Sequence, residues 1–326
     1  MENRNQKTKA LVEAGMVSAL TVVIALIVIF IGLDTIAAVC IIPIPITVIY
    51  VRRGFKYSVG TLLISTILVS MFSNPIQGTA NTLILGSVGI FLGYFIQKKY
   101  TSYRLLSIMG LVVALAAILH LLIYILLIYK SGINGMINEA IIDPINKSFD
   151  IVTKFAGNNK DSLAQLEKMK KIFTKDNILM LLPGMFIVIG YMFAYLNYAI
   201  TKTVLKRLKH ETSEMIQFTK IYIPSIVGML IFLSYIIGAV LMMNKFAVGG
   251  YISMSSQLVL QCVFTLQGMC VFSYFLLNKY NLSKGITAII VIVPLLFNLS
   301  FAFTIVGMID LIYDFRKVNP NRVIKR

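Results

Sequence analysis

Charged residues are scarce in this sequence, and the residue types that build many catalytic and metal sites are few. Asp, Glu, Lys and Arg make up 13% of the 326 residues, and there are 3 cysteines, 2 histidines and no tryptophan. Soluble domains average about 25% charged residues. With 58% hydrophobic residues and a mean hydropathy of +0.85, the composition excludes an ordinary soluble domain and indicates a membrane protein.

The few reactive residues do not form known motifs. There is no G-x-x-x-x-G-K-[ST] loop for nucleotide phosphates, so the chain is not itself expected to be an ATPase. His120 and His210 lack H-E-x-x-H spacing, and a structural or surface role is expected for both. Cys40, Cys262 and Cys270 lack C-x-x-C spacing. No nucleophile elbow and no carboxylate pair within a span is found. We expect no enzyme activity, no catalytic residue, no cofactor and no metal.

Long intervals without charge predict membrane-spanning helices. A helix needs roughly 20 apolar residues to cross a hydrocarbon core about 30 Å thick, and unpaired backbone groups are costly in lipid. Breaks at Gly32-Leu33-Asp34 and Ser73-Asn74-Pro75 divide the two longest intervals into hairpins. The sequence therefore predicts an all-α polytopic bundle of about eight spans and a final apolar segment, at 10–31, 35–51, 57–73, 79–97, 105–129, 177–200, 219–243, 252–278 and 285–313.

The distribution of Lys and Arg predicts the orientation, because cytoplasmic loops retain these residues. A cytoplasmic N-terminus places most of them on the inner side: Arg4, Lys7, Lys9, Arg52, Arg53, Lys56, Lys98, Lys99, Arg104, Lys202, Lys206, Arg207, Lys209, Lys220, Lys279 and Lys284. The net charge of +17 then follows from topology, and no nucleic-acid partner is expected. We expect a multi-pass protein of the bacterial cytoplasmic membrane, with the lipid bilayer as its surroundings.

The segment 285–313 decides where the basic C-terminal tail lies. Nine full spans would place that tail outside, which conflicts with its charge. Pro294, followed by Asn298, predicts a helix break. A bent or re-entrant pair of short helices would return the tail to the cytoplasm, and this interpretation is favoured for Arg316, Lys317, Arg322, Lys325 and Arg326.

One polar loop divides the chain into three predicted parts: helices in 1–130, an extracytoplasmic loop in 131–176, and helices with the basic tail in 177–326. Asp143-Pro144 predicts the start of a short amphipathic helix, with Phe149 and Val152 on one face. Ser162 and Gln165 predict a second one. A lid over a ligand and a plain connector remain equally open for this loop.

Polar and small residues within the spans supply the candidate binding positions. Gln257 and Gln261 are one turn apart and either hydrogen-bond a ligand or join two helices. Asp310 is the deepest acidic residue, and an interfacial anchor is favoured for it. In the first span small residues repeat every four positions, which favours close approach of another helix. These residues are Ala10, Ala14 and Ser18.

Several segments resemble known membrane proteins. KTKALVEAGMVSAL at 7–20 resembles the opening helix of the substrate-capture (S) components of energy-coupling factor transporters, and PIPITVIYVRRGFKYSVGTLLIS at 43–65 and LGSVGIFLGYFIQKK at 85–99 resemble later helices. Together with LPGMFIVIGYMFAYLNYAITKTVLKRL at 182–208 and GMIDLIYDFRK at 307–317, the whole chain resembles the YybS-type family of uncharacterised bacterial membrane proteins, which is distantly similar to S components.

The resemblance implies a transport component that captures a small molecule and depends on separate ATP-driven subunits. It also implies that Ala10, Ala14 and Ser18 form a surface for the helix of a transmembrane coupling subunit, and it assigns no ligand residue. The alternative is a non-transporting membrane scaffold or regulatory protein, in which cytoplasmic segments such as 202–214 bind a soluble partner or anionic lipid.

Overall fold

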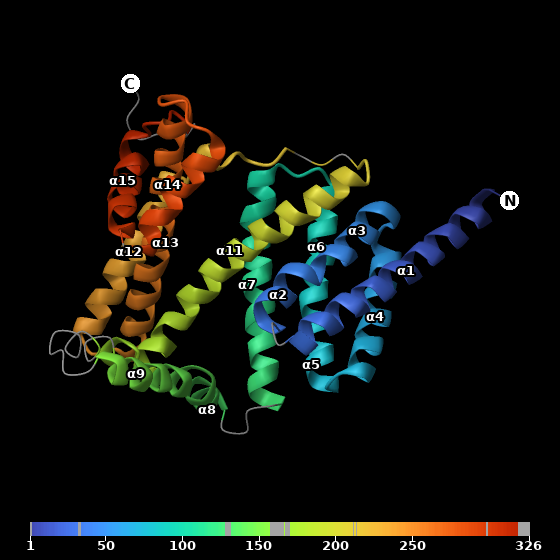
Figure 1. Ribbon diagram of the computed structural model, residues 1–326, viewed down its shortest axis with the longest axis horizontal. Helices are drawn as coiled ribbons and strands as arrows, with labels where there is room; N and C mark the ends of the chain where they lie inside the picture. The colour runs from blue at the N-terminus through green and yellow to red at the C-terminus, as the bar shows by residue number, and fades with distance from the viewer. Residues whose placement is uncertain are drawn as a thin grey trace. The chain divides into compact units, whose positions relative to one another are not determined.

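The computed structural model describes residues 2–31, 34–127, 132–156, 166, 170–210, 212, 214–297 and 299–318. Every regular element in these ranges is a helix (Figure 1). Seven helical segments are long and apolar enough to cross a membrane: Asn5–Ile31, Phe55–Phe72, Pro75–Gln97, Ser102–Leu127, Lys175–Arg207, Ser225–Met243 and Ala247–Asn278. The predicted all-α polytopic bundle is confirmed, with seven such segments and a bent C-terminal pair among the described residues.

The chain forms two compact units. Unit 1 comprises Met1–Lys170 and Ile189–Met215, and unit 2 comprises Lys171–Val188 and Ile216–Arg326. Helix α11 (Lys175–Arg207) contributes its first part to unit 2 and its second part to unit 1. This division differs from the predicted boundaries at 130 and 176, because most of the polar loop and half of α11 belong with the N-terminal helices.

Unit 1 begins with six α-helices of eight or more residues. They are α1 (Glu2–Ile31), α2 (Asp34–Ile41), α3 (Pro43–Arg53), α4 (Phe55–Phe72), α6 (Gly86–Gln97) and α7 (Ser102–Leu127). Two short elements, α5 (Pro75–Thr79) and the π-helix η1 (Ala80–Leu85), lead directly into α6. The Asn74 side chain caps α5 by accepting a hydrogen bond from the Ile76 N–H, at 3.0 Å. The predicted hairpin break at Ser73-Asn74-Pro75 is therefore present.

The predicted span 35–51 consists of two short helices, α2 and α3, which are not among the full-length candidate spans. Pro43 and Pro45 lack backbone N–H groups, so the helix is interrupted at Ile42. Helix α3 packs against α6, where the Thr47 hydroxyl donates to the carbonyls of Pro43 and Gly89, at 2.9 Å each. The predicted segment at 35–51 is therefore present as two helices broken at Ile42, beside the seven unbroken candidate spans among the described residues.

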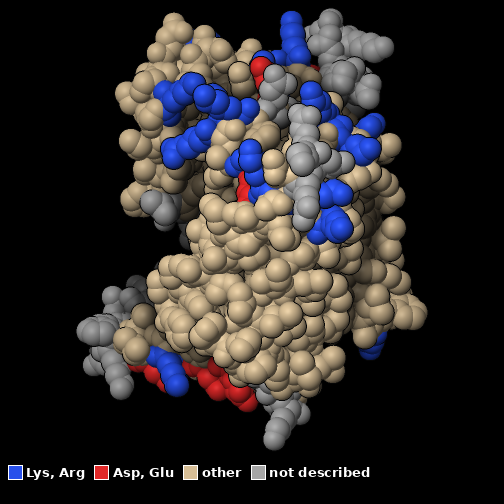
Figure 2. Space-filling view, turned by 90° about the vertical axis from the view of Figure 1, so that its right-hand side faces the viewer, with Lys and Arg blue, Asp and Glu red and all other residues tan. Residues whose placement is uncertain are grey.

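Ion pairs fix how α1 and α3 lie in unit 1. The Glu13 carboxylate binds Nε of Arg52 at 2.7 Å and Nε of Arg53 at 2.6 Å. The end of α3 therefore lies beside the N-terminal part of α1, as the predicted hairpin requires. Figure 2 views the molecule from the right-hand side of Figure 1. In this view Lys and Arg gather near the top, an apolar band lies below them, and a group of Asp and Glu lies near the bottom.

The described part of the polar loop is helical. It contains α8 (Gly132–Ile137), the π-helix η2 (Asn138–Ile142) and α9 (Asp143–Ala156). Helix α9 begins at Asp143, as predicted, and Phe149 is buried, but Val152 is 47% exposed. The second predicted helix, with Ser162 and Gln165, lies outside the described residues.

Unit 2 is built around α13. Its elements are η3 (Phe218–Lys220), α12 (Ser225–Met243), α13 (Ala247–Asn278), α14 (Lys284–Leu296), α15 (Ser300–Tyr313) and the start of α11. Helices α14 and α15 meet at a bend of 111°. Each is about 20 Å long, too short for a hydrocarbon core of about 30 Å.

The end of α15 lies beside the entry to α12. Nη1 of Arg316 donates to the carbonyls of Thr219 and Ile221, at 2.8 and 2.9 Å. Because α12 and α13 are joined by a tight turn, with Gly249 against Met242, α13 ends at this same end of unit 2. The α14–α15 pair therefore starts and finishes on one side, as the re-entrant interpretation predicts, and the tail residues beyond 318 lie outside the described residues.

Glycines allow the closest helix contacts in both units. A Cβ on Gly89 of α6 would collide with the Pro43 carbonyl oxygen of α3. In unit 2, a Cβ on Gly268 would collide with the Phe303 carbonyl oxygen, and one on Gly307 would collide with the Phe264 carbonyl oxygen. The helix backbones touch at these points, so a side chain cannot be added without moving a helix.

Replacement of Gly89 by Ala tests this contact. We expect Gly89→Ala to destabilise the protein by about 1–3 kcal/mol, because the new methyl group meets backbone rather than a flexible side chain. Gly60→Ala in α4 is the matched control, since a Cβ there meets nothing within 4 Å. Thermal unfolding in detergent compares the two, and equal midpoints for both variants would contradict the close α3–α6 contact.

Reporter fusions test the orientation. The predicted orientation places the tail in the cytoplasm, where green fluorescent protein folds, so this reporter fused after Arg326 should fluoresce. The predicted orientation places the α12–α13 turn outside, so alkaline phosphatase inserted at Lys245 should be active. An active phosphatase after Arg326 would show that α14 and α15 together cross the membrane.

Candidate functional site

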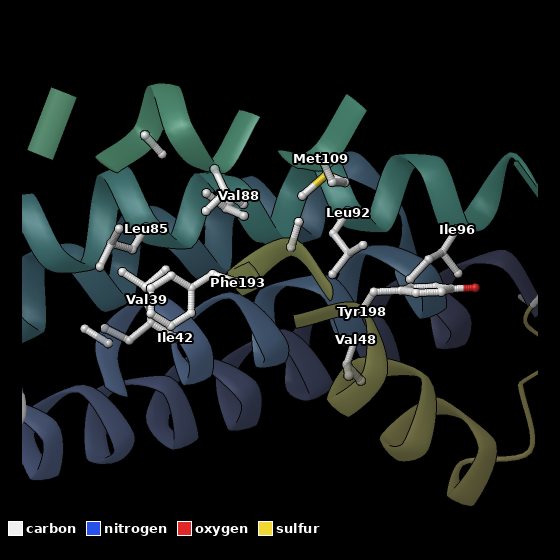
Figure 3. Close-up of a cluster of buried hydrophobic side chains, with 14 of the residues drawn as sticks. Val39, Ile42, Val48, Leu85, Val88, Leu92, Ile96, Met109, Phe193 and Tyr198 are labelled. Atoms are coloured by element: carbon white, nitrogen blue, oxygen red, sulfur yellow. The ribbon is translucent and has the colours of Figure 1, made fainter. Parts of the chain in front are cut away.

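The core of unit 1 is a layer of apolar side chains between helices. Figure 3 shows two groups within it: Val39, Ile42, Leu85 and Phe193 at one end, and Val48, Leu92, Ile96, Met109 and Tyr198 at the other. These residues come from α2, α3, η1, α6, α7 and the second part of α11. Polar side chains that border this layer are costly to bury unless they are paired, so each has a structural or a functional reason.

The most unusual polar group lies where η1 faces α7. Nε2 of His120 is 2.6 Å from Oδ1 of Asn81, which is fully buried, and the Tyr124 ring lies against the imidazole with centroids 4.7 Å apart. Single π-helical turns inside longer helices are rare and occur often at functional sites. We call Asn81, Thr82 and His120 the η1 polar site.

Two buried polar atoms of the η1 polar site have no partner among the described residues. They are Nδ2 of Asn81 and Oγ1 of Thr82. Turning the Asn81 amide over would exchange its oxygen and nitrogen and still leave one of them unpaired. Each unpaired buried group costs about 1–3 kcal/mol, so this arrangement is a poor way to stabilise a core.

A second amide on the same core is also half satisfied. Nδ2 of Asn197 donates to the Val39 carbonyl at 3.0 Å, whereas its buried Oδ1 has no partner among the described residues. Leu85 follows Asn81 by one helical turn and Phe193 precedes Asn197 by one turn, and both lie in the same apolar group in Figure 3. Unit 1 therefore has amide donors and acceptors available along one core.

The η1 polar site lies far from the basic end of unit 1. Ser102 marks that end, because its hydroxyl meets the Tyr198 hydroxyl at 3.0 Å and donates to the Glu214 carbonyl. A rise of 1.5 Å per residue places His120 about 27 Å along α7 from Ser102. The site is thus close to the opposite face of a hydrocarbon core about 30 Å thick.

The η1 polar site has groups that can hydrogen-bond a polar ligand. It offers amides, a hydroxyl and one imidazole, and these neutral groups hydrogen-bond polar ligands. The described residues contain no group of three or more His, Cys, Asp and Glu that could hold a metal ion.

The predicted partner-helix surface is covered by the chain itself. Ala10, Ala14 and Ser18 are 5%, 8% and 2% exposed. They face α4, whose Thr61 and Ser65 hydroxyls donate to the carbonyls of Ala14 and Ser18, at 3.4 and 3.3 Å. The small residues therefore serve close packing between α1 and α4 within unit 1.

The predicted glutamine pair is not part of a buried site. Gln257 and Gln261 are both exposed on α13 and make no hydrogen bond with described residues. A third glutamine, Gln267, is buried instead: its Nε2 donates to Oδ2 of Asp310 at 3.1 Å, and its Oε1 accepts from the Ile223 N–H at 3.1 Å.

Asp310 anchors the end of α15 through a buried ion pair. Nη2 of Arg316 binds its Oδ2 at 3.0 Å, with side chains 0% and 1% exposed, and the Phe315 N–H donates to Oδ1 at 2.9 Å. Together with Gln267 and the carbonyls of residues 219 and 221, this network joins α13, α15 and the segment before α12. Its charged groups are paired, which fits a structural role.

Nothing in the sequence around Asn81 or His120 indicates that the two residues are neighbours in the fold. They are separated by 39 residues, and only the packing of η1 against α7 brings them together. The signal that could have been used is the presence of a histidine and an asparagine within otherwise apolar spans, since such groups require partners in lipid.

Comparison with known proteins places the chain in a family. Residues 19–311 match the family described as "Predicted membrane protein (DUF2232)", so the chain belongs to it. "Uncharacterized protein YybS" of Bacillus subtilis (strain 168) is 24% identical over 318 residues, which cover 95% of this chain and 98% of that protein. No solved structure matches. The resemblance to the YybS-type family is confirmed, whereas the similarity to S components is not shown by these matches.

The buried ion pair of unit 2 can be tested by removing one or both charges. Asp310→Asn should destabilise the protein by about 3–5 kcal/mol, because Arg316 is left buried without its counter-charge. The double variant Asp310→Asn with Arg316→Met should lose less free energy of unfolding than Asp310→Asn and Arg316→Met lose in total when each is made alone. Unfolding curves in detergent measure both, and Lys317→Ala is the control outside the pair. Strict additivity would contradict a coupled ion pair.

Proposed function

We propose that this multi-pass membrane protein is a transport component that binds a small, neutral or anionic molecule in unit 1 and depends on separate ATP-driven subunits. The observation that carries the proposal is the η1 polar site. Its unpaired amide and hydroxyl groups lower stability, and a bound polar molecule would compensate them. A purely structural core gains nothing from leaving such groups unpaired.

The architecture of unit 1 supports this proposal. Helices α1, α2–α3, α4, α5–α6, α7 and the second part of α11 make six segments, and S components are bundles of about six helices. A separate energy source is needed, since the sequence has no phosphate-binding loop for ATP.

The coupling subunit is expected on the exposed face of α1. Leu11, Met16 and Leu20 are 67%, 66% and 53% exposed, next to the stripe that α4 covers. In a membrane these residues face either lipid or another helix. Binding of the subunit here, rather than on Ala10, Ala14 and Ser18, keeps the α1–α4 contact intact.

The second candidate is a scaffold or regulatory protein that acts at its basic end through residues 202–214. Deletion within the outer loop, between residues 133 and 156, separates the two candidates. A ligand-capturing protein should lose activity in the cell after this deletion, whereas a scaffold that acts inside should keep it.

Native mass spectrometry of the protein from its host membrane tests the transport proposal. The wild-type protein should retain a small molecule and associate with further subunits. Asn81→Leu and His120→Leu should lose the small molecule, because each removes a polar group of the η1 polar site. Gln257→Leu, on an exposed face of α13, is the control and should retain it.

Two results would contradict this proposal. One is wild-type protein that carries no small molecule and no other subunit under conditions that preserve membrane complexes. The other is retention of the small molecule by Asn81→Leu and His120→Leu to the same extent as by the wild type.

A further inference from the structure

The basic end of unit 1 contains a polar cavity that the proposed transport function does not use. Its volume is about 390 Å³, and it lies between the start of α1, the α3–α4 turn and the end of α6. The residues that matter for its chemistry are Gln6, Lys7, Arg52, Arg53, Tyr57 and Gln97. Three of these side chains are cations and none is an acid.

The two arginines remain available for a ligand although each is already fixed in place. Glu13 binds both through their Nε atoms, at 2.7 and 2.6 Å. The Nη groups of Arg52 and Arg53 make no hydrogen bond with described residues, and the side chains are 33% and 31% exposed. One carboxylate cannot neutralise two guanidinium groups and the Lys7 ammonium, so the cavity keeps a net positive charge.

The backbone adds donors at the same place. Gly54 lines the cavity and connects α3 to α4 with φ +88°, a conformation that side-chain-bearing residues rarely adopt. No side chain caps α4. The first N–H groups of a helix have no intrahelical partner and lie at the positive end of its dipole. Helix α4 therefore directs uncapped N–H groups and a partial positive charge toward the α3–α4 turn.

We propose that this cavity binds a phosphate group. Paired arginine Nη groups match the geometry of phosphate oxygens and can bind them with two parallel hydrogen bonds. A lysine, a tyrosine hydroxyl and two glutamine amides add donors around the same space. A single carboxylate or halide would use only part of this set, whereas the several oxygens of a phosphate use all of it.

The phosphate has two possible sources with the same chemistry. The cavity lies at the basic end of unit 1, where the segments expected in the cytoplasm meet, so an anionic phospholipid head group is within reach. The volume also admits a soluble phosphate compound. Both sources present phosphate oxygens to Arg52 and Arg53, and only a binding experiment separates them.

The experiment uses the full-length protein in a maltoside detergent, which contains no phosphate. Thermal unfolding is measured with added phosphatidylglycerol, with inorganic pyrophosphate, or with neither. The wild-type protein should be stabilised by at least one of the two additives. Stabilisation by phosphatidylglycerol alone identifies the lipid source, and stabilisation by pyrophosphate identifies a soluble source.

Substitutions then locate the site and separate it from ordinary ion pairing. Arg52→Gln with Arg53→Gln should weaken the binding at least about tenfold, because charge-assisted hydrogen bonds are lost. Glu13→Gln should strengthen it, because the competing carboxylate is removed while both arginines remain. Arg104→Gln, at the same end but outside the cavity, is the matched control and should bind as the wild type does.

The proposal is overturned if neither additive stabilises the wild type, or if the Arg52 and Arg53 double variant responds as the wild type does. It is also overturned if Glu13→Gln leaves binding unchanged, since removal of a carboxylate beside the bound phosphate must alter the affinity for that anion. The retained small molecule at the η1 polar site is a separate readout, so failure here leaves the transport proposal unchanged.

Discussion

Close backbone contact between helices is the constraint on which both units depend. Lipid tails are as apolar as leucine, so burial of apolar surface does little to drive helices together within a membrane. Van der Waals contact and hydrogen bonds must do so instead, and both require short distances. Gly89 against Pro43 in unit 1, and Gly268 and Gly307 against the backbones of Phe303 and Phe264 in unit 2, supply those distances.

The two units treat their buried polar groups differently. In unit 2, the charges of Asp310 and Arg316 are paired with each other and supported by Gln267 and backbone groups, although Nε of Arg316 has no partner among the described residues. In unit 1, Asn81 and Asn197 are each only half satisfied. The buried groups of unit 2 are thus a charge pair that joins helices, whereas those of unit 1 are neutral amides with a free donor or acceptor.

Unit 1 also separates two kinds of chemistry along its length. Neutral amides and an imidazole lie toward one end of its helices, and guanidinium and ammonium groups gather at the other. The neutral groups suit hydrogen bonding to a polar molecule, and the cationic groups suit binding of phosphate oxygens. Because the two sets of residues are far apart, a substitution in one set does not touch the residues of the other.

Much of this architecture could be predicted from the sequence, because the constraint behind it is local in the chain. A stretch of about 20 apolar residues must be helical in lipid whatever its neighbours are, so the long spans are readable from the residues alone. The C-terminal break was also expected, although α14 continues through Pro294 and ends at Leu296. The same reasoning placed a segment at 35–51 but not its division into α2 and α3, which follows from Pro43 and Pro45 at the start of α3.

The candidate sites could not be predicted in the same way. The sequence by itself determined that the protein is a helical membrane protein and that its basic residues lie mostly between the apolar spans. Only the tertiary structure decided that Asn81 meets His120, that α4 covers Ala14, and that Gln257 and Gln261 stay exposed. The physical reason is that membrane insertion depends on the hydropathy of each segment separately, whereas pairing of polar groups depends on which helices become neighbours.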